Sequence, residues 1–271
     1  MTYKFGKTLL LTGAALLLAG QASAHRAWIL PSSFTLSGEN QRITVDAAIS
    51  NNLFYPNHHA LSLEQVSVTG PDGSNIEMED VSTGEYRSVF DVPLVQEGTY
   101  RIGSQGSGYF ASWEEDGERR RWRGTEEELA NENIADKPGV RISKNDRTNM
   151  TFVTLGAPSQ SAFTKTGEGL ELASGTHPND IYAGEEVSFS FTLNGEATNG
   201  VEIEIVRGHD RYRDSEGAKA LTTDADGMIN FTLEEAGPYW LSAEVDGKAM
   251  LNGKEISSRT SYIMTFEALP F

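Results

Sequence analysis

Apolar and polar residues alternate with a period of two along most of this chain. In residues 42–49, Ile43, Val45 and Ala47 lie on one side of an extended chain and polar residues lie between them. This alternation is typical of a strand with one buried face. Similar short patterns recur at residues 66–68, 76–78, 86–95, 98–102, 148–155, 187–193, 201–205, 229–233, 237–241 and 261–266. The pattern therefore predicts an all-β protein.

The alternation breaks at residues 105–147, a long segment rich in Glu, Asp and Arg. Within it, Thr125 and Glu128 have the spacing of a capping box, which predicts one short helix over residues 126–134, before Pro138. Connections this long are usually functional or mobile. We therefore expect an insertion in the first of two β-domains.

Residues 1–24 have the features of a cleavable secretory signal. Lys4 and Lys7 precede a short apolar stretch, residues 9–20, and small residues at Ala22 and Ala24 fit a cleavage site. The apolar stretch is too short for a bilayer span, so no membrane span is expected after processing. We expect export to the periplasm and a mature chain that begins at His25.

Residues 157–169 are small, polar and interrupted by Gly and Pro, and we interpret them as a linker. The predicted organisation is a signal peptide at 1–24, a β-domain at 25–156, the linker, and a second β-domain at 170–271. Short strands separated by turns predict two immunoglobulin-like or prealbumin-like β-sandwiches in tandem. In the second domain, Asp224–Gly227 resembles the start of a calcium loop, but a hairpin turn is the stronger interpretation.

Composition limits the chemistry that the mature chain can perform. Without Lys4 and Lys7, it carries 20 basic and 39 acidic residues, a net charge of −19. Such a charge disfavours nucleic acid as a partner. Cysteine is absent, so a metal site must use imidazole, carboxylate, amide, amine or thioether groups. The basic run 119–123 is flanked by acidic residues, which favours mutual neutralisation.

The five histidines are the candidate metal ligands: His25, His58, His59, His177 and His209. At a new N-terminus, His25 offers both its α-amine and its imidazole; alternatively it is an exposed residue of a frayed end. His58 and His59 lie in a loop and are either ligands or ordinary surface residues. His177 is either a ligand near the domain junction or a turn residue that bonds nearby backbone. For His209 we favour a surface role.

Five segments spread over the mature chain resemble a family of bacterial periplasmic proteins of unassigned biochemistry: residues 24–28 (AHRAW), 54–58 (FYPNH), 169–172 (GLEL), 176–180 (THPND) and 223–227 (TDADG). Members are often labelled as periplasmic components of cobalt or nickel uptake, and many are encoded near TonB-dependent receptors. The second module also resembles prealbumin-like and carboxypeptidase regulatory-like domains. The resemblance implies a periplasmic β-sandwich protein in which His25, His58 and His177 match family positions, whereas His59 is an additional histidine.

These observations predict a periplasmic accessory protein for metal uptake that binds a transition-metal ion through His25, His58 or His59, and His177. Nitrogen ligands suit copper and nickel, and cobalt, zinc or iron are further candidates. A TonB-dependent receptor or an inner-membrane metal transporter would be the partner. No catalytic spacing signature is present, so we do not expect an enzyme.

Two alternatives remain open. One is a structural or interaction module without metal that docks onto an envelope receptor or transporter. The other is a copper-dependent oxidative enzyme in which the terminal histidine holds the metal. Metal analysis of the processed protein separates the first alternative from the metal-binding hypothesis, and peroxide-driven turnover of a substrate would be needed for the second.

Overall fold

The structure, a computed structural model, describes residues 25–271; the expected signal peptide at 1–24 lies outside the described residues. The described chain consists of strands, one α-helix and three short 3-10 helices. These helices are α1 (Glu126–Asn131), η1 (Ile134–Asp136), η2 (Gln160–Phe163) and η3 (Asp210–Tyr212). Within residues 25–271, no helix is long and apolar enough to cross a membrane. The predicted all-β class is confirmed.

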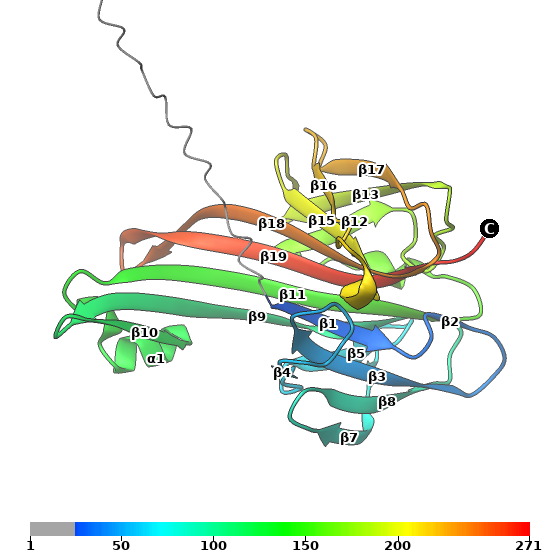
Figure 1. Ribbon diagram of the computed structural model, residues 1–271, viewed down its shortest axis with the longest axis horizontal. Helices are drawn as coiled ribbons and strands as arrows, with labels where there is room; N and C mark the ends of the chain where they lie inside the picture. The colour runs from blue at the N-terminus through cyan, green and yellow to red at the C-terminus, as the bar shows by residue number, and fades with distance from the viewer. Residues whose placement is uncertain (1–24) are drawn as a thin grey trace, which may run out of the picture.

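The strands form three sheets (Figure 1). The N-terminal sheet has the order β1-β3-β8-β7 with β4 beside β3, and contains β1 (Arg26–Pro31), β3 (Gln41–Ser50), β4 (His59–Ala60), β7 (Glu79–Thr83) and β8 (Ser88–Leu94). The C-terminal sheet has the order β12-β13-β14 with β17 beside β13, and contains β12 (Leu170–Gly175), β13 (Glu186–Leu193), β14 (Glu196–Ala197) and β17 (Met228–Thr232).

The central sheet connects the two halves of the chain. Its strands, in spatial order, are β16 (Lys219–Thr222), β15 (Glu202–Arg207), β18 (Gly237–Leu251), β19 (Lys254–Ala268), β11 (Arg141–Leu155), β9 (Gly98–Glu115), β5 (Val66–Thr69) and β6 (Asn75–Ile76), with β10 (Glu118–Gly124) beside β9 and β2 (Thr35–Leu36) beside β11. Strands β11 and β19 pair in parallel from Ser143–Ser257 to Thr151–Thr265. Hydrogen bonds therefore join the predicted N-terminal and C-terminal domains within one sheet.

Each face of the central sheet supports one core. Phe152 and Met264 belong to the core shared with the C-terminal sheet, whereas Val153 belongs to the core shared with the N-terminal sheet. Ile263, next to Met264, likewise packs against Trp28 of β1. Successive residues of a strand point to opposite faces, so these neighbours separate the two cores. The two sandwiches thus lie back to back on a common sheet rather than as separate units in tandem.

The predicted linker at 157–169 is fastened to β9 of the central sheet and to β12 of the C-terminal sheet. Ser159 Oγ accepts a hydrogen bond from the Thr99 amide at 2.9 Å, and Ser161 Oγ donates to the Thr99 carbonyl at 2.7 Å. The amides of Thr166 and Gly167 donate to the carboxylate of Glu171 at 2.7 and 2.9 Å. The segment has the composition of a linker, but its backbone is held by specific hydrogen bonds.

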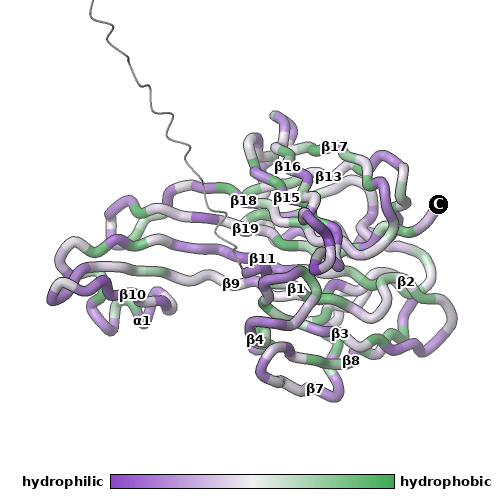
Figure 2. The backbone as a smooth tube through the Cα atoms, viewed as in Figure 1, coloured by the Kyte–Doolittle hydropathy of each residue, from purple (hydrophilic) through white to green (hydrophobic). Residues whose placement is uncertain are grey.

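Residues 105–147, expected to interrupt the sheet, instead prolong it into an arm (Figure 1). The outer halves of β9, β11, β18 and β19 form the arm, and β10 and α1 lie at its end. A small cluster that includes Tyr109, Leu129 and Ile134 packs α1 against β9. Residues 143–147 of β11 are polar. Figure 2 shows the strands of the arm, β11 among them, largely in white and purple. Residues 143–147 lack the apolar alternation by which the other strands were predicted.

Two local features predicted from the sequence, a helix cap and a hairpin turn, are present in the structure. Thr125 and Glu128 form the predicted capping box, although α1 ends at Asn131 because Asn133 adopts a left-handed conformation, with φ at 52°. Asp224 Oδ1 accepts hydrogen bonds from the amides of Asp226 and Met228 at 3.0 and 2.9 Å. Residues 224–227 therefore form the predicted hairpin turn.

Candidate metal site

Three of the four predicted ligands lie together beside the beginning of β1. The ring of His25 stacks on the ring of His58, with their centroids 3.7 Å apart and their planes at 20°. The ring of His59 lies 4.7 Å from that of His58, at 40°. All three side chains are exposed. We call this group the histidine cluster.

Strand β1 is anchored from its first residue. The guanidinium of Arg26 forms a bidentate ion pair with Glu216, at 3.0 and 2.9 Å, and also contacts Glu204 at 3.2 Å. It also lies over the ring of Trp240, 5.2 Å from the ring centroid. The indole of Trp240 donates a hydrogen bond to the carbonyl of Ala27 at 3.0 Å. Since its neighbour is held in this way, His25 extends from a fixed strand rather than from a frayed end.

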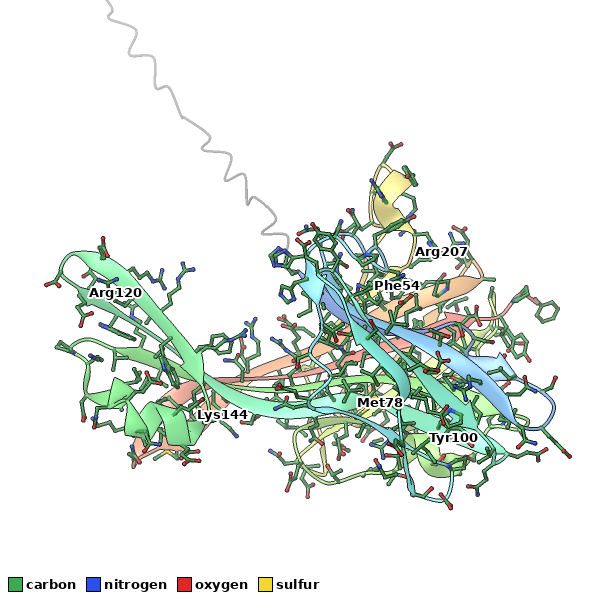
Figure 3. The ribbon with its side chains drawn as sticks, turned by 90° about the horizontal axis from the view of Figure 1, so that it is seen from below. Phe54, Met78, Tyr100, Arg120, Lys144 and Arg207 are labelled. Carbon is green, nitrogen blue, oxygen red and sulfur yellow. The ribbon has the colours of Figure 1, made fainter. Side chains whose placement is uncertain are left out.

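The loop that carries His58 is shaped by a buried aromatic ring. Phe54 has a φ of 64°, which is unfavourable for a bulky residue. Its ring, labelled in Figure 3, is buried together with Trp28 and Val206. It meets the Trp28 ring edge-on at 5.6 Å between centroids. A Cβ atom at Gly208 would lie 2.4 Å from this ring, so glycine is needed there. Burial of the ring holds the backbone in its strained conformation.

Hydrogen bonds close the same loop across its base. The side-chain oxygen Oδ1 of Asn57 accepts a hydrogen bond from the backbone amide of Asn51 at 2.8 Å. The side-chain nitrogen Nδ2 of Asn57 donates to Oδ1 of Asn52 at 2.9 Å. The amide of Tyr55 donates to the Asn52 carbonyl at 3.1 Å. His58 directly follows Asn57, so these bonds fix the point from which its side chain leaves the loop.

The electrostatics at His58 favour the neutral form of its imidazole ring. Desolvation, followed by the proximity of His25 and of His59, lowers the pKa of His58. Nδ1 of His59 lies 3.0 Å from the carbonyl oxygen of Ala60. A carbonyl oxygen can only accept, so the neutral ring carries its proton on Nδ1 and exposes the lone pair of Nε2. Neutral imidazole is the form that binds metal ions.

The stacked arrangement does not yet converge on a metal ion. Within residues 25–271, no group of three or more His, Cys, Asp or Glu side chains is placed to hold one. Parallel rings direct their nitrogen atoms along similar directions rather than toward a common point. The three side chains are exposed, so rotation about their side-chain torsions can bring the nitrogens together. The donor set is therefore suited to a metal, whereas its geometry requires rotation of the rings.

A broad cleft of about 1000 Å³ begins beside His25 and runs over the central sheet. Its walls carry charges of both signs, including Glu202, Glu204, Arg147 and Arg259. The histidine cluster is thus reached from open solvent rather than through a narrow channel.

His177, the fourth predicted ligand, is not part of this group. Its Nδ1 accepts a hydrogen bond from the amide of Asn179 at 3.1 Å, so Nε2 carries the proton in the neutral ring. Nε2 lies 3.2 Å from the Ser159 carbonyl and 3.0 Å from Thr99 Oγ1. Both nitrogens are therefore engaged, Nδ1 in the turn at Asn179 and Nε2 with Ser159 of residues 157–169 and with Thr99 of β9. The fold does not bring His177 together with the histidine cluster, and its alternative role as a turn residue that bonds nearby backbone fits this geometry.

The environment of His177 makes stability depend on pH. Burial lowers the pKa of His177 below that of the unfolded chain, which is about 6.5. The unfolded chain therefore binds this proton more readily. The corresponding contribution to stability is present above the unfolded pKa and is lost as the pH falls through the folded pKa. We expect His177→Gln to show a shallower fall in the free energy of unfolding between pH 7 and pH 5, measured by urea titration. An unchanged slope would show that His177 does not contribute.

Several residues that shape the site gave no signal in the sequence. Arg26, Glu216 and Trp240 are far apart in the chain and meet only through the fold. His209 lies outside the stacked group, with its ring edge-on to Tyr55 at 6.3 Å. It agrees with the surface role favoured from the sequence and provides a control histidine close to the loop.

No curated protein matches this sequence. Among solved structures, the D0-D1 domain of intimin is 9% identical, with coverage of 88% of this chain and 96% of that chain and a TM-score of 0.21. The mouse nectin-like molecule 4 ectodomain is 7% identical, with coverages of 92% and 65% and a TM-score of 0.20. Alpha-2-macroglobulin of Escherichia coli is 10% identical, with coverages of 90% and 31% and a TM-score of 0.22.

The sequence identities and TM-scores of these three structures are too low to support an argument about function. The sequence itself is more informative about relationship. Residues 22–247 match DUF4198, a domain family of unknown function, and the chain belongs to this family.

Proposed function

We propose that this protein binds a transition-metal ion through the α-amine and imidazole of His25 and the imidazole of His58. The observation that carries the proposal is the contact of these two rings, 3.7 Å apart, one from an anchored strand and the other from a loop held by a buried Phe54. The proposal requires processing after Ala24, so that the amine of His25 is free. Delivery to the periplasm and a role in metal uptake are part of it.

The chemistry of the donors selects the metal. An amine and two imidazoles form a nitrogen-rich set, which suits Cu²⁺ and Ni²⁺, and Cu²⁺ binds most tightly in the ordinary affinity order. Cobalt, zinc and iron ions would bind more weakly or need further ligands. His59 can add a nitrogen if its ring turns toward His58. Positions that these groups leave open remain available to water or to a second carrier.

The placement of the cluster favours a binding protein over an enzyme. Exposed ligands at the edge of an open cleft allow a bound ion to pass to another protein by exchange of ligands. A TonB-dependent receptor or an inner-membrane metal transporter would be such a partner. In this role the protein keeps the ion bound during transfer and carries out no reaction.

The test is a competition titration of the processed protein with Cu²⁺ and Ni²⁺. We expect His58→Ala to weaken binding at least about tenfold, because it removes one of three nitrogens. The matched control is His209→Ala, which removes a nearby exposed histidine outside the cluster and should change affinity less than about twofold. Equal losses in both variants, or no binding by the processed protein, would favour an interaction module without metal.

A further inference from the structure

The arm carries a row of arginines on one face of the central sheet. Arg119, Arg121 and Arg123 alternate along β10, and Arg121 is aligned with Arg141 of β11 through Ser112 of β9. Residues directly opposite each other in a sheet share a face, so all four arginines point to the same side. All four are exposed. We call this surface the arginine face.

The four arginines form no ion pairs with the acidic residues near them in the sequence, although Glu114 lies opposite Arg119 on the same face. None of them forms an ion pair or a side-chain hydrogen bond with another residue in the described part of the chain. Arg120 points to the opposite face and forms ion pairs with Glu115 at 3.6 Å and Glu118 at 3.3 Å. The charge neutralisation expected from the sequence is therefore found at Arg120. A concentration of unpaired positive charge is unexpected in a chain with a net charge of −17.

Strand β10 also has an unpaired edge. Among the described strands it pairs only with β9, and the two are joined by a two-residue turn at Asp116 and Gly117, with φ of 56° and 77°. In such a hairpin, the two residues that flank the turn exchange backbone hydrogen bonds with each other. Along the strand, every second residue then bonds to the partner strand, and the residues between them direct their amides to the open edge. The amides that point to the open edge are therefore those of Arg119, Arg121 and Arg123.

The edge and the arginine face together specify the occupant. A second β10 strand is disfavoured, because arginines would lie opposite arginines. An extended segment with Asp or Glu at every second residue would place carboxylates about 7 Å apart, which matches the spacing of the three arginines. Phe110, opposite Arg123 and 42% exposed, supplies an apolar contact on the same face. Arginine also binds carboxylates in a bidentate manner.

We propose that β10 takes up an acidic extended segment of a partner protein as an additional strand, with its carboxylates opposite Arg119, Arg121 and Arg123. Backbone bonds along the edge give affinity, and the alternate arginines select the sequence. This inference is independent of the metal site, because the arm and the histidine cluster use different residues.

The test uses the full processed protein and a fluorescent peptide of alternating Glu and Thr, measured by fluorescence anisotropy. We expect binding that weakens as salt rises. The triple variant Arg119→Ser, Arg121→Ser, Arg123→Ser should weaken binding at least about tenfold. Arg120→Ser is the matched control on the same strand and should change it less than about twofold. Circular dichroism checks that the variants are folded.

A second peptide separates strand addition from attraction by charge alone. Methylation of the peptide amides that would face β10 removes the backbone donors and keeps every carboxylate. We expect the methylated peptide to bind at least about tenfold more weakly. Equal binding of the two peptides would show a surface for anionic polymers or lipids, and would overturn the proposal. No binding of the unmodified peptide, or equal losses in Arg120→Ser and the triple variant, would also overturn it.

Discussion

A single residue added in front of His25 should lower the affinity of the processed protein for Cu²⁺ at least about tenfold, or roughly 1.4 kcal/mol. The addition turns the α-amine into an amide, which is a poor ligand, and breaks the chelate ring between that nitrogen and the imidazole. An unperturbed α-amine has a pKa of about 8 and an imidazole about 6.5, so binding should also weaken as the pH drops toward 5.

The extended protein is expected to keep its fold, because the anchoring contacts begin at Arg26, with Glu204 and Glu216. Equal thermal unfolding temperatures of the extended and the processed protein would check that the fold is kept. The comparison is made by competition against a chelator of known affinity. If the two forms bind Cu²⁺ equally well, His25 does not act through its amine, and the metal-binding proposal loses its central ligand.

The substitution Phe54→Ala should lower the free energy of unfolding by about 3–5 kcal/mol. The ring fills the space between Trp28, Val206 and Gly208, and alanine would leave a cavity there. The left-handed backbone at residue 54 would also lose the contact that holds it. The loop should then release His58, so metal affinity should fall together with stability.

Phe110→Ala is the matched control for this substitution. Phe110 is 42% exposed on the arm, and its replacement should change stability by about 0.5 kcal/mol or less. Urea unfolding of both variants measures the difference. If Phe54→Ala lowers the free energy of unfolding as little as Phe110→Ala does, the buried ring does not hold the loop.

The sequence pattern predicted the strands with one buried face better than those with two. In residues 42–47 the alternation is clean and β3 is found there. Around Ile263 and Met264 the chain is apolar at successive positions, because the central sheet is buried on both faces. That pattern does not reveal which face supports which core. The back-to-back arrangement of the two sandwiches could therefore not be derived from alternation alone.

The arm was missed for a different physical reason. Its strands are half-buried or exposed along much of their length, and residues 143–147 carry no apolar side chain, so the hydrophobic effect leaves no period there. Backbone pairing with β9 and β19 still holds them in the sheet. Only the helix start at Thr125 was predictable there, because capping is a local interaction.

The candidate site was predictable as a set of residue types and only partly as an arrangement. His25 and His58 were selected because imidazole is a common metal ligand, and the fold brings them into contact. The role of His177 depends on Ser159 and Asn179 and could not be read from its neighbours in sequence. The anchoring of Arg26 by Glu216 joins residues 190 positions apart, and no local pattern indicates such a contact.

The most direct test of metal binding by His25 and His58 is the imidazole region of the NMR spectrum of the processed protein during addition of Cu²⁺. Resonances are assigned with single His→Ala variants. The paramagnetic ion broadens signals from nearby nuclei, so less than one equivalent should remove the signals of His25 and His58 first and leave those of His177 and His209 intact. Early loss of the His209 or His177 signals, with His25 and His58 unchanged, would contradict the proposed site.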